Sequence, residues 1–101
     1  MVTHIENLDL EQERRDALAN LIAEHGEDWL KEYEPSSFGC HELLDRTALV
    51  ADLLERSVLW HPASIQNPEW FRLAERAVAL LQDLYQRIGE AHLEDEDDAE
   101  K

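Results

Sequence analysis

Cysteine, proline, glycine and basic residues are all scarce in this chain, and each scarcity excludes a class of protein. Cys40 is the only cysteine, so no disulfide can form within the chain, which favours a reducing compartment. Three glycines and three prolines in 101 residues exclude collagen-like or low-complexity chains and favour helices. No apolar run approaches the roughly 20 residues of a membrane span. We therefore expect a cytoplasmic protein without membrane association.

The nine basic residues face 24 acidic ones, which gives a net charge of -15. Residues 1–34 hold ten acids and three bases, and residues 94–101 hold six acids and one base. Without a basic patch, binding to nucleic acid or to anionic membranes is not expected. The charge favours a basic protein partner, and the alternative is that it only keeps the chain in solution.

An apolar content of 44% indicates a folded body, and its spacing predicts three helices. The first begins after Asp9, a candidate N-cap. Its apolar face carries Leu10, Ala17, Leu18, Leu21 and His25. Beyond Gly26 the residues Trp29, Leu30 and Tyr33 point about 100° away from that face, so we expect a kink or a restart near Gly26.

The second helix is expected over residues 40–60 and the third from Pro68. The inward stripe of the second is predicted to hold Cys40, Leu43, Thr47, Val50, Ala51, Leu54 and Val58, with Leu44 beside it. Asn67 is the expected N-cap of the third helix, and Pro68 fills its first position. The third stripe is predicted to hold Trp70, Ala74, Ala77, Val78, Leu81, Leu84, Tyr85, Ile88 and His92.

These elements predict an all-α fold, an up-down-up antiparallel three-helix bundle that forms one domain over residues 1–93. Residues 94–101 are almost entirely acidic and are expected to form a disordered tail. Leu49, Leu53, Trp60, Leu73 and Leu80 exceed what such a core needs, which suggests a homodimer that buries them.

Residues 41–45 read His-Glu-Leu-Leu-Asp and resemble the helical zinc motif H-E-x-x-H, with aspartate in place of the second histidine. Ligands four residues apart share a helix face and can hold one metal ion. His41 and Asp45 nevertheless fall on the polar side of the predicted helix. The simpler interpretation is a surface pair between His41 and Asp45, beside a second pair between Glu42 and Arg46.

Assembling the bundle gathers several polar side chains at one of its ends. His25, Cys40 and His92 are candidate ligands for Zn or Fe, because imidazole and thiolate suit these metals. The same end holds His41, Thr47 and Tyr85. The alternative is a structural hydrogen-bond network, since buried polar groups need partners.

Catalytic motifs are lacking, since the chain has no glycine-rich phosphate loop and no nucleophile elbow. The sequence therefore favours a non-catalytic protein that binds another protein as an adaptor, an inhibitor or an antitoxin-like partner. The predicted contact residues are Trp29, Tyr33, Leu49, Leu53 and Trp60. The alternative is a bundle that binds a metal or a small ligand, and that functions as an enzyme in one version of this hypothesis.

Overall fold

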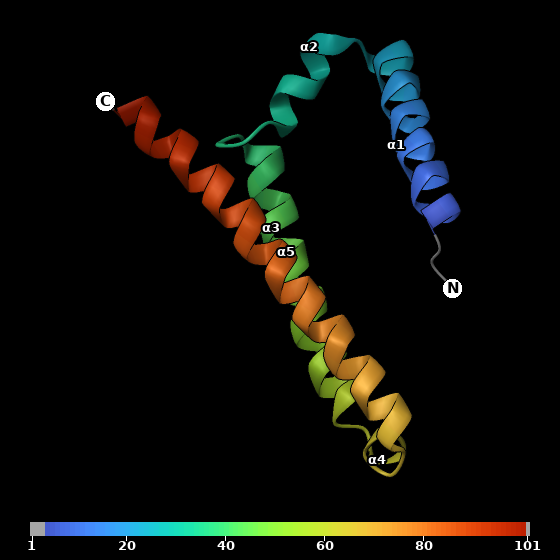
Figure 1. Cartoon of the computed structure of the whole chain (residues 1–101). Helices are drawn as coiled ribbons and strands as arrows, with labels where there is room; N and C mark the ends of the chain where they lie inside the picture. The colour runs from blue at the N-terminus through green and yellow to red at the C-terminus, as the bar shows by residue number, and fades with distance from the viewer. Residues whose placement is uncertain (1–3, 101) are drawn as a thin grey trace. The chain divides into compact units, whose positions relative to one another are not determined.

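The chain folds into helices joined by short connections, which confirms the all-α prediction (Figure 1). The computed structural model describes the backbone of residues 4–100 and the side chains of residues 9–93. The elements in chain order are α1 (His4–His25), α2 (Glu27–Leu30), η1 (Lys31–Tyr33), α3 (Phe38–Leu54), η2 (Glu55–Leu59), α4 (Pro62–Ile65) and α5 (Pro68–Glu100). None of these helices, within the described residues, has the length and hydropathy that a membrane span requires.

The chain divides into two units, the first ending at Tyr33 and the second beginning at Glu34. The first unit contains α1, α2 and η1. Gly26 separates α1 from α2 and adopts φ 88° and ψ 160°, a conformation open to glycine alone. Its N–H still closes the last turn of α1 by donating to the carbonyl of Ile22 at 2.8 Å. The helix is therefore interrupted at the glycine, and α2 begins at Glu27.

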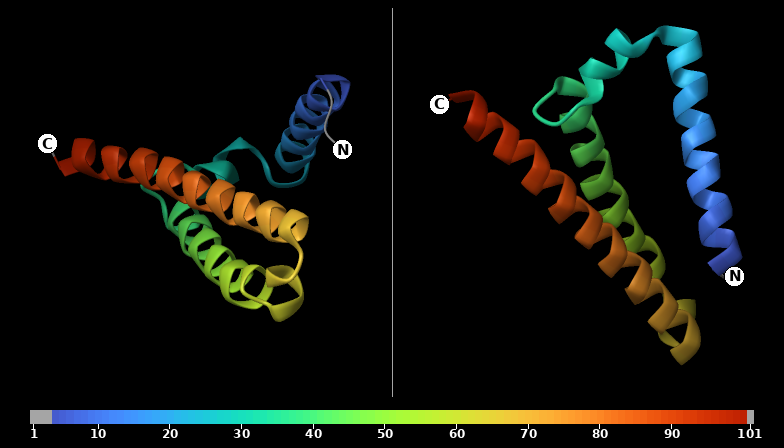
Figure 2. Two further views of the ribbon diagram at one scale, coloured as in Figure 1. Left: turned by 60° about the horizontal axis from the view of Figure 1, so that its bottom comes forward. Right: turned by 45° about the horizontal axis from the view of Figure 1, so that its top comes forward.

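The second unit is a helical hairpin, in which α3 and α5 run antiparallel and side by side while α4 lies in the turn (Figures 1 and 2). Both long helices have a side-chain cap. Ser37 Oγ accepts the N–H of Cys40 at 3.1 Å, and Asn67 Oδ1 accepts the N–H of Trp70 at 3.1 Å. The predicted start of the third helix at Asn67 and Pro68 is confirmed.

The hairpin core is a narrow seam with alternating spacings of three and four residues. Its members on α3 are Cys40, Leu44, Thr47, Ala51 and Leu54, and on α5 they are Phe71, Ala74, Val78, Leu81, Tyr85, Ile88 and His92. All are buried or half-buried except Tyr85, which is 38% exposed. Such a pattern is the heptad seam of a two-helix coiled coil. At Gly89 the Cβ of an alanine would lie only 3.8 Å from Leu44, so the helices pack closely there.

A π-turn, η2, rotates the end of this seam by one residue. The N–H of Trp60 donates to the carbonyl of Glu55 at 3.1 Å, an i to i+5 hydrogen bond. As a result Leu59 is 4% exposed, whereas Val58, predicted to be in the core, is 46% exposed. The prediction of Val58 as a core residue was wrong because a regular α-helix was assumed through this turn.

Leu43 and Val50 were also predicted to point inward, but each exposes about half of its side chain. Within the second unit only α5 packs along α3, and one neighbouring helix buries a seam rather than a broad stripe. The up-down-up three-helix bundle stays a prediction.

The backbone of α5 is helical to Glu100, beyond the point where the sequence predicted a tail. The side chains of residues 94–101 lie outside the described residues, and the disordered tail predicted there stays a prediction. The single domain predicted over residues 1–93 also stays a prediction, and each unit is described by itself.

Candidate functional site

The predicted polar end of the chain contains one well-defined cluster, around His92. This imidazole is 3% exposed, and its Nδ1 accepts the N–H of Ser36 at 2.7 Å. The ring of His41 lies beside it, with the two centroids 5.6 Å apart. Together with Tyr85 they line a cavity of about 420 Å³. The structure therefore brings together three of the predicted polar residues and adds Ser36, which the sequence analysis did not single out.

Cys40 and Thr47 lie in the seam and are buried there. The Thr47 hydroxyl donates to the carbonyl of Leu43 at 2.8 Å, so it is satisfied within its own helix. Cys40 is a free, buried thiol at 8% exposure. Both behave as small core residues, since neither side chain lines the cavity beside His92.

His25, the third predicted metal ligand, belongs to the first unit. Its ring stacks on Trp29 with centroids 4.0 Å apart, and its Nε2 lies 3.6 Å from a carboxylate oxygen of Glu24. Among residues with described side chains, no three His, Cys, Asp or Glu residues are grouped to hold a metal ion. The site of His25, Cys40 and His92 for Zn or Fe gains no geometric support and stays a hypothesis.

The zinc-like segment at residues 41–45 forms surface pairs instead. His41 Nε2 lies 3.5 Å from Asp45, and an arginine nitrogen of Arg46 lies 3.4 Å from Glu42. All four side chains are more than 40% exposed. The interpretation as two surface pairs is confirmed.

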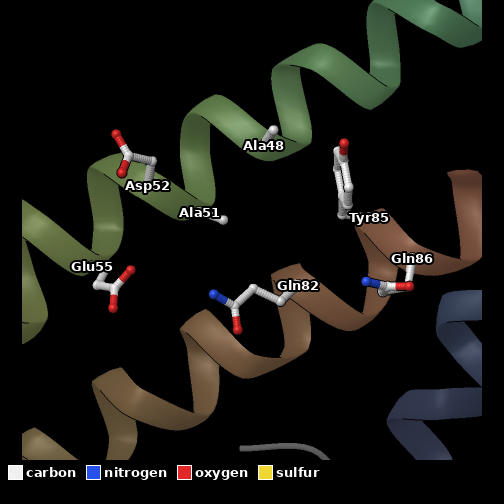
Figure 3. A pocket seen from close by; sticks show the side chains of 7 residues that line it. All are labelled: Ala48, Ala51, Asp52, Glu55, Gln82, Tyr85 and Gln86. Carbon is white, nitrogen blue, oxygen red and sulfur yellow. The ribbon is translucent and has the colours of Figure 1, made fainter.

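The two sides of the hairpin differ sharply in polarity. Because α3 and α5 run in opposite directions, the residues that directly follow a seam residue lie on the same side of the hairpin in both helices. Here lie Ala48, Asp52 and Glu55 opposite Gln82 and Gln86, and with Ala51 and Tyr85 they line a cavity of about 400 Å³ (Figure 3). This side is polar and accessible to water.

A step of one residue back from the seam leads to the opposite side, where Arg46 and Arg87 are charged and most of the other side chains are apolar and exposed. We call this side the apolar face, and it consists of Leu43, Val50 and Val58 with the outer Leu53 from α3 and η2, and of Trp70 and Leu84 with the outer Leu73 and Leu80 from α5. Each of these side chains is 46–66% exposed. Val58 of η2 and Trp70 of α5 line a common cavity, so the apolar residues of the two helices lie on the same side of the hairpin.

That cavity, which we call the tip pocket, lies where the hairpin turns. It measures about 310 Å³ and is lined by Ser57, Val58, His61, Ala63, Ser64, Trp70 and Ala74. His61 Nδ1 accepts the N–H of Ala63 at 3.0 Å and so caps α4. Ser64 is 8% exposed, and its Oγ has no hydrogen-bond partner within the described residues.

The predicted contact residues fall in both units. In the first unit the ring of Trp29 stacks on His25, with centroids 4.0 Å apart, and is tilted by 51° against Tyr33, with centroids 4.8 Å apart. In the second unit Leu49, Leu53 and Trp60 are 64%, 52% and 54% exposed. Trp60 also packs edge-on against Phe71, with centroids 5.4 Å apart.

The sequence analysis missed the tip pocket and Ser64 because the connection between helices was treated as featureless. The signal was present in Pro62, since proline favours the first position of a helix and so marks the start of α4. Comparisons with protein-family models, curated proteins and solved structures gave no match.

Proposed function

We propose that this protein acts by binding another protein through the apolar face, without catalysis of its own. The observation that supports this most is the composition of the face in a chain of net charge -15. None of its eight residues is acidic, and each is about half exposed. Eight such side chains offer roughly 800 Å², the area that one partner contributes to an interface of standard size. A surface of this kind is normally covered by a partner.

The geometry favours an amphipathic helix as the docking segment. Two antiparallel helices leave a groove between them, and an apolar helix stripe fits into such a groove. Basic residues on the outer side of that helix would be attracted by the acidic excess of this chain, which raises the association rate at low salt. The partner is thus a basic protein with an amphipathic helix. By binding that helix, this chain would act as an adaptor or as an inhibitor.

Two neighbouring substitutions on α5 test the proposal. Leu80 lies on the apolar face and is 66% exposed, whereas Ala79 is exposed on the polar side. Leu80→Glu and Ala79→Glu add the same charge one residue apart. A protein captured from native lysate by the wild type should be captured by Ala79→Glu, lost with Leu80→Glu and weakened by high salt. Equal capture by the two variants would overturn the proposal.

Helix α1 is a second candidate to cover the apolar face, because the sequence predicts a bundle of three helices. The observation that favours it is the stripe of α1, where Leu10, Leu18 and Leu21 are 61%, 40% and 37% exposed. Thermal unfolding separates the two candidates. If α1 covers the face in the free chain, Leu80→Glu should lower Tm by several degrees while Ala79→Glu does not. If the face awaits a partner, both variants should keep the wild-type Tm.

Sedimentation equilibrium completes the test, because a second copy could also cover the apolar face. A mass near twice 11.7 kDa that returns to 11.7 kDa in Leu80→Glu would establish a homodimer as the occupant. A mass of 11.7 kDa at all concentrations leaves the face to α1 or to a different protein, which the thermal unfolding separates.

A further inference from the structure

We propose that the tip pocket receives a tyrosine side chain of the docking helix. This inference rests on the proposed function, because the pocket opens onto the apolar face and shares Val58 and Trp70 with it. Pockets at such a position hold the anchor residues that dominate binding energy in protein interfaces. The chemistry of the lining specifies the anchor.

The walls of the tip pocket favour an uncharged aromatic ring. In a chain that is one-third charged, the lining contains no acidic, lysine or arginine side chain. Trp70, Val58 and Ala74 offer apolar surface, and the indole of Trp70 is 55% exposed. A ring packed against this indole gains the preference of aromatic pairs in addition to the buried area. A charged anchor would lose its hydration without a counter-charge.

The hydroxyl of Ser64, which has no hydrogen-bond partner within the described residues, favours a ring that carries a polar group. Its Oγ is shielded from water and has no partner within the described residues, which is costly for a buried hydroxyl. Rotation about one side-chain bond redirects this oxygen, and it can both donate and accept. The phenolic hydroxyl of tyrosine would satisfy it, whereas phenylalanine would leave it unpaired.

The local backbone gives an independent reason to regard this end as a binding site. Ser57 and Val58 of the lining belong to the π-turn η2, and turns of this kind occur frequently at functional sites. The turn widens the helix by one residue and moves Val58 out of the core onto the pocket wall. A regular helix would instead close Val58 against α5.

Side-chain analogues test the pocket in the full chain without knowledge of the partner. We expect p-cresol, the analogue of tyrosine, to shift the amide NMR signals of Ser57, Ser64 and Trp70 in a saturable way. Toluene, the analogue of phenylalanine, should bind about fivefold to tenfold more weakly, the effect of one buried neutral hydrogen bond. In Ser64→Ala the two probes should bind equally, and this variant should unfold at or above the wild-type Tm, since it removes an unpaired hydroxyl.

A pair of tryptophan variants provides the matched control. Trp70→Leu removes a pocket wall and should abolish binding of p-cresol, whereas Trp60→Leu, outside the lining, should leave it unchanged. Absence of saturable shifts, or equal binding of both probes to the wild type, would overturn the inference. The proposed function would survive that result if Leu80→Glu still abolished capture. Probe binding together with equal capture by the Leu80 and Ala79 variants would overturn the proposed function instead.

Discussion

Ser36 and His92 are joined by a hydrogen bond of 2.7 Å across 56 residues of chain, with the backbone N–H of Ser36 donating to the imidazole Nδ1. Ser36 adopts a positive φ of 70°, which a non-glycine residue holds only when its surroundings favour it. The bond fastens the loop before α3 to the last part of the described α5 seam. It gives the polar cluster a structural role that does not depend on a ligand.

Removing the acceptor at residue 92 should therefore destabilise the hairpin. His92→Leu removes the acceptor of the Ser36 N–H, and because Ser36 is exposed we expect a loss of about 0.5–1.5 kcal/mol in urea unfolding, the net contribution of one hydrogen bond. His92→Asn places an amide oxygen near the position of Nδ1 and should recover part of that loss. Equal stability of the two variants would show that the bond to Ser36 does not hold the loop.

The register after the π-turn predicts that truncating two neighbouring side chains will lower the free energy of unfolding by different amounts. Leu59→Ala should cost about 2–5 kcal/mol of unfolding free energy, the range for buried leucines. Val58→Ala should cost less than about 1 kcal/mol, because Val58 is 46% exposed. Urea denaturation measures both, and the reverse order would mean that a regular α-helix continues through residues 55–59.

Gly26 and Gly89 should respond differently to replacement by alanine. Gly89 lies inside α5, where an added Cβ would meet Leu44 at an ordinary 3.8 Å, so Gly89→Ala should stabilise the hairpin by about 0.5–1 kcal/mol. Gly26 has φ 88°, and Gly26→Ala should strain the connection by about 1–3 kcal/mol although the space around it is open. Urea unfolding checks the first variant, and helix content by circular dichroism checks the second.

The pKa of the Glu11 carboxyl should lie well below the ordinary value of a glutamate. Hydrogen bonds from Arg14, supported by Arg15, lower its pKa from 4.5 to about 2. A lowered pKa in the folded chain means that the interaction stabilises α1 fully above about pH 4.5 and is lost as the pH falls through about 2. Glu11→Gln should thus reduce helix content at neutral pH and match the wild type below pH 2.

Glu13 provides the control for this titration, since its carboxylate makes no ion pair with any residue whose side chain is described. Glu13→Gln should leave the helix content at neutral pH nearly unchanged. NMR titration of the Glu11 side-chain carbon gives the direct measurement, and a midpoint near 4.5 would contradict the bidentate pair with Arg14.

Local signals predicted the start of α5 well, whereas α1 begins at His4, before the N-cap expected at Asp9. Asn67 and Pro68 marked the start of α5 because capping is decided by a few adjacent residues. The surface pairs at His41 and Arg46 followed from helical spacing alone. These features need no knowledge of which helices pack together.

Burial depends on the number and direction of neighbouring helices, and here the sequence was insufficient. Leu43 and Val50 carry the same apolar signal as Leu44 and Ala51, and only the line of α5 decides which row enters the seam. Composition did not reveal the π-turn, because its extra residue shows only in the hydrogen bond from Trp60 to Glu55. Nor did Ser64 stand out, since a lone serine near proline is an ordinary turn residue.

The wide turn at residues 55–59 also affects how this chain should be aligned with any relative. A π-turn is equivalent to one residue inserted into an α-helix. A relative that lacks one residue there would keep the seam positions of Ala51 and Leu54. A regular α-helix would then place the counterpart of Leu59 in the same seam. An ungapped alignment would instead pair that core leucine with Val58. The insertion should therefore be sought as a single gap that accompanies the tip pocket.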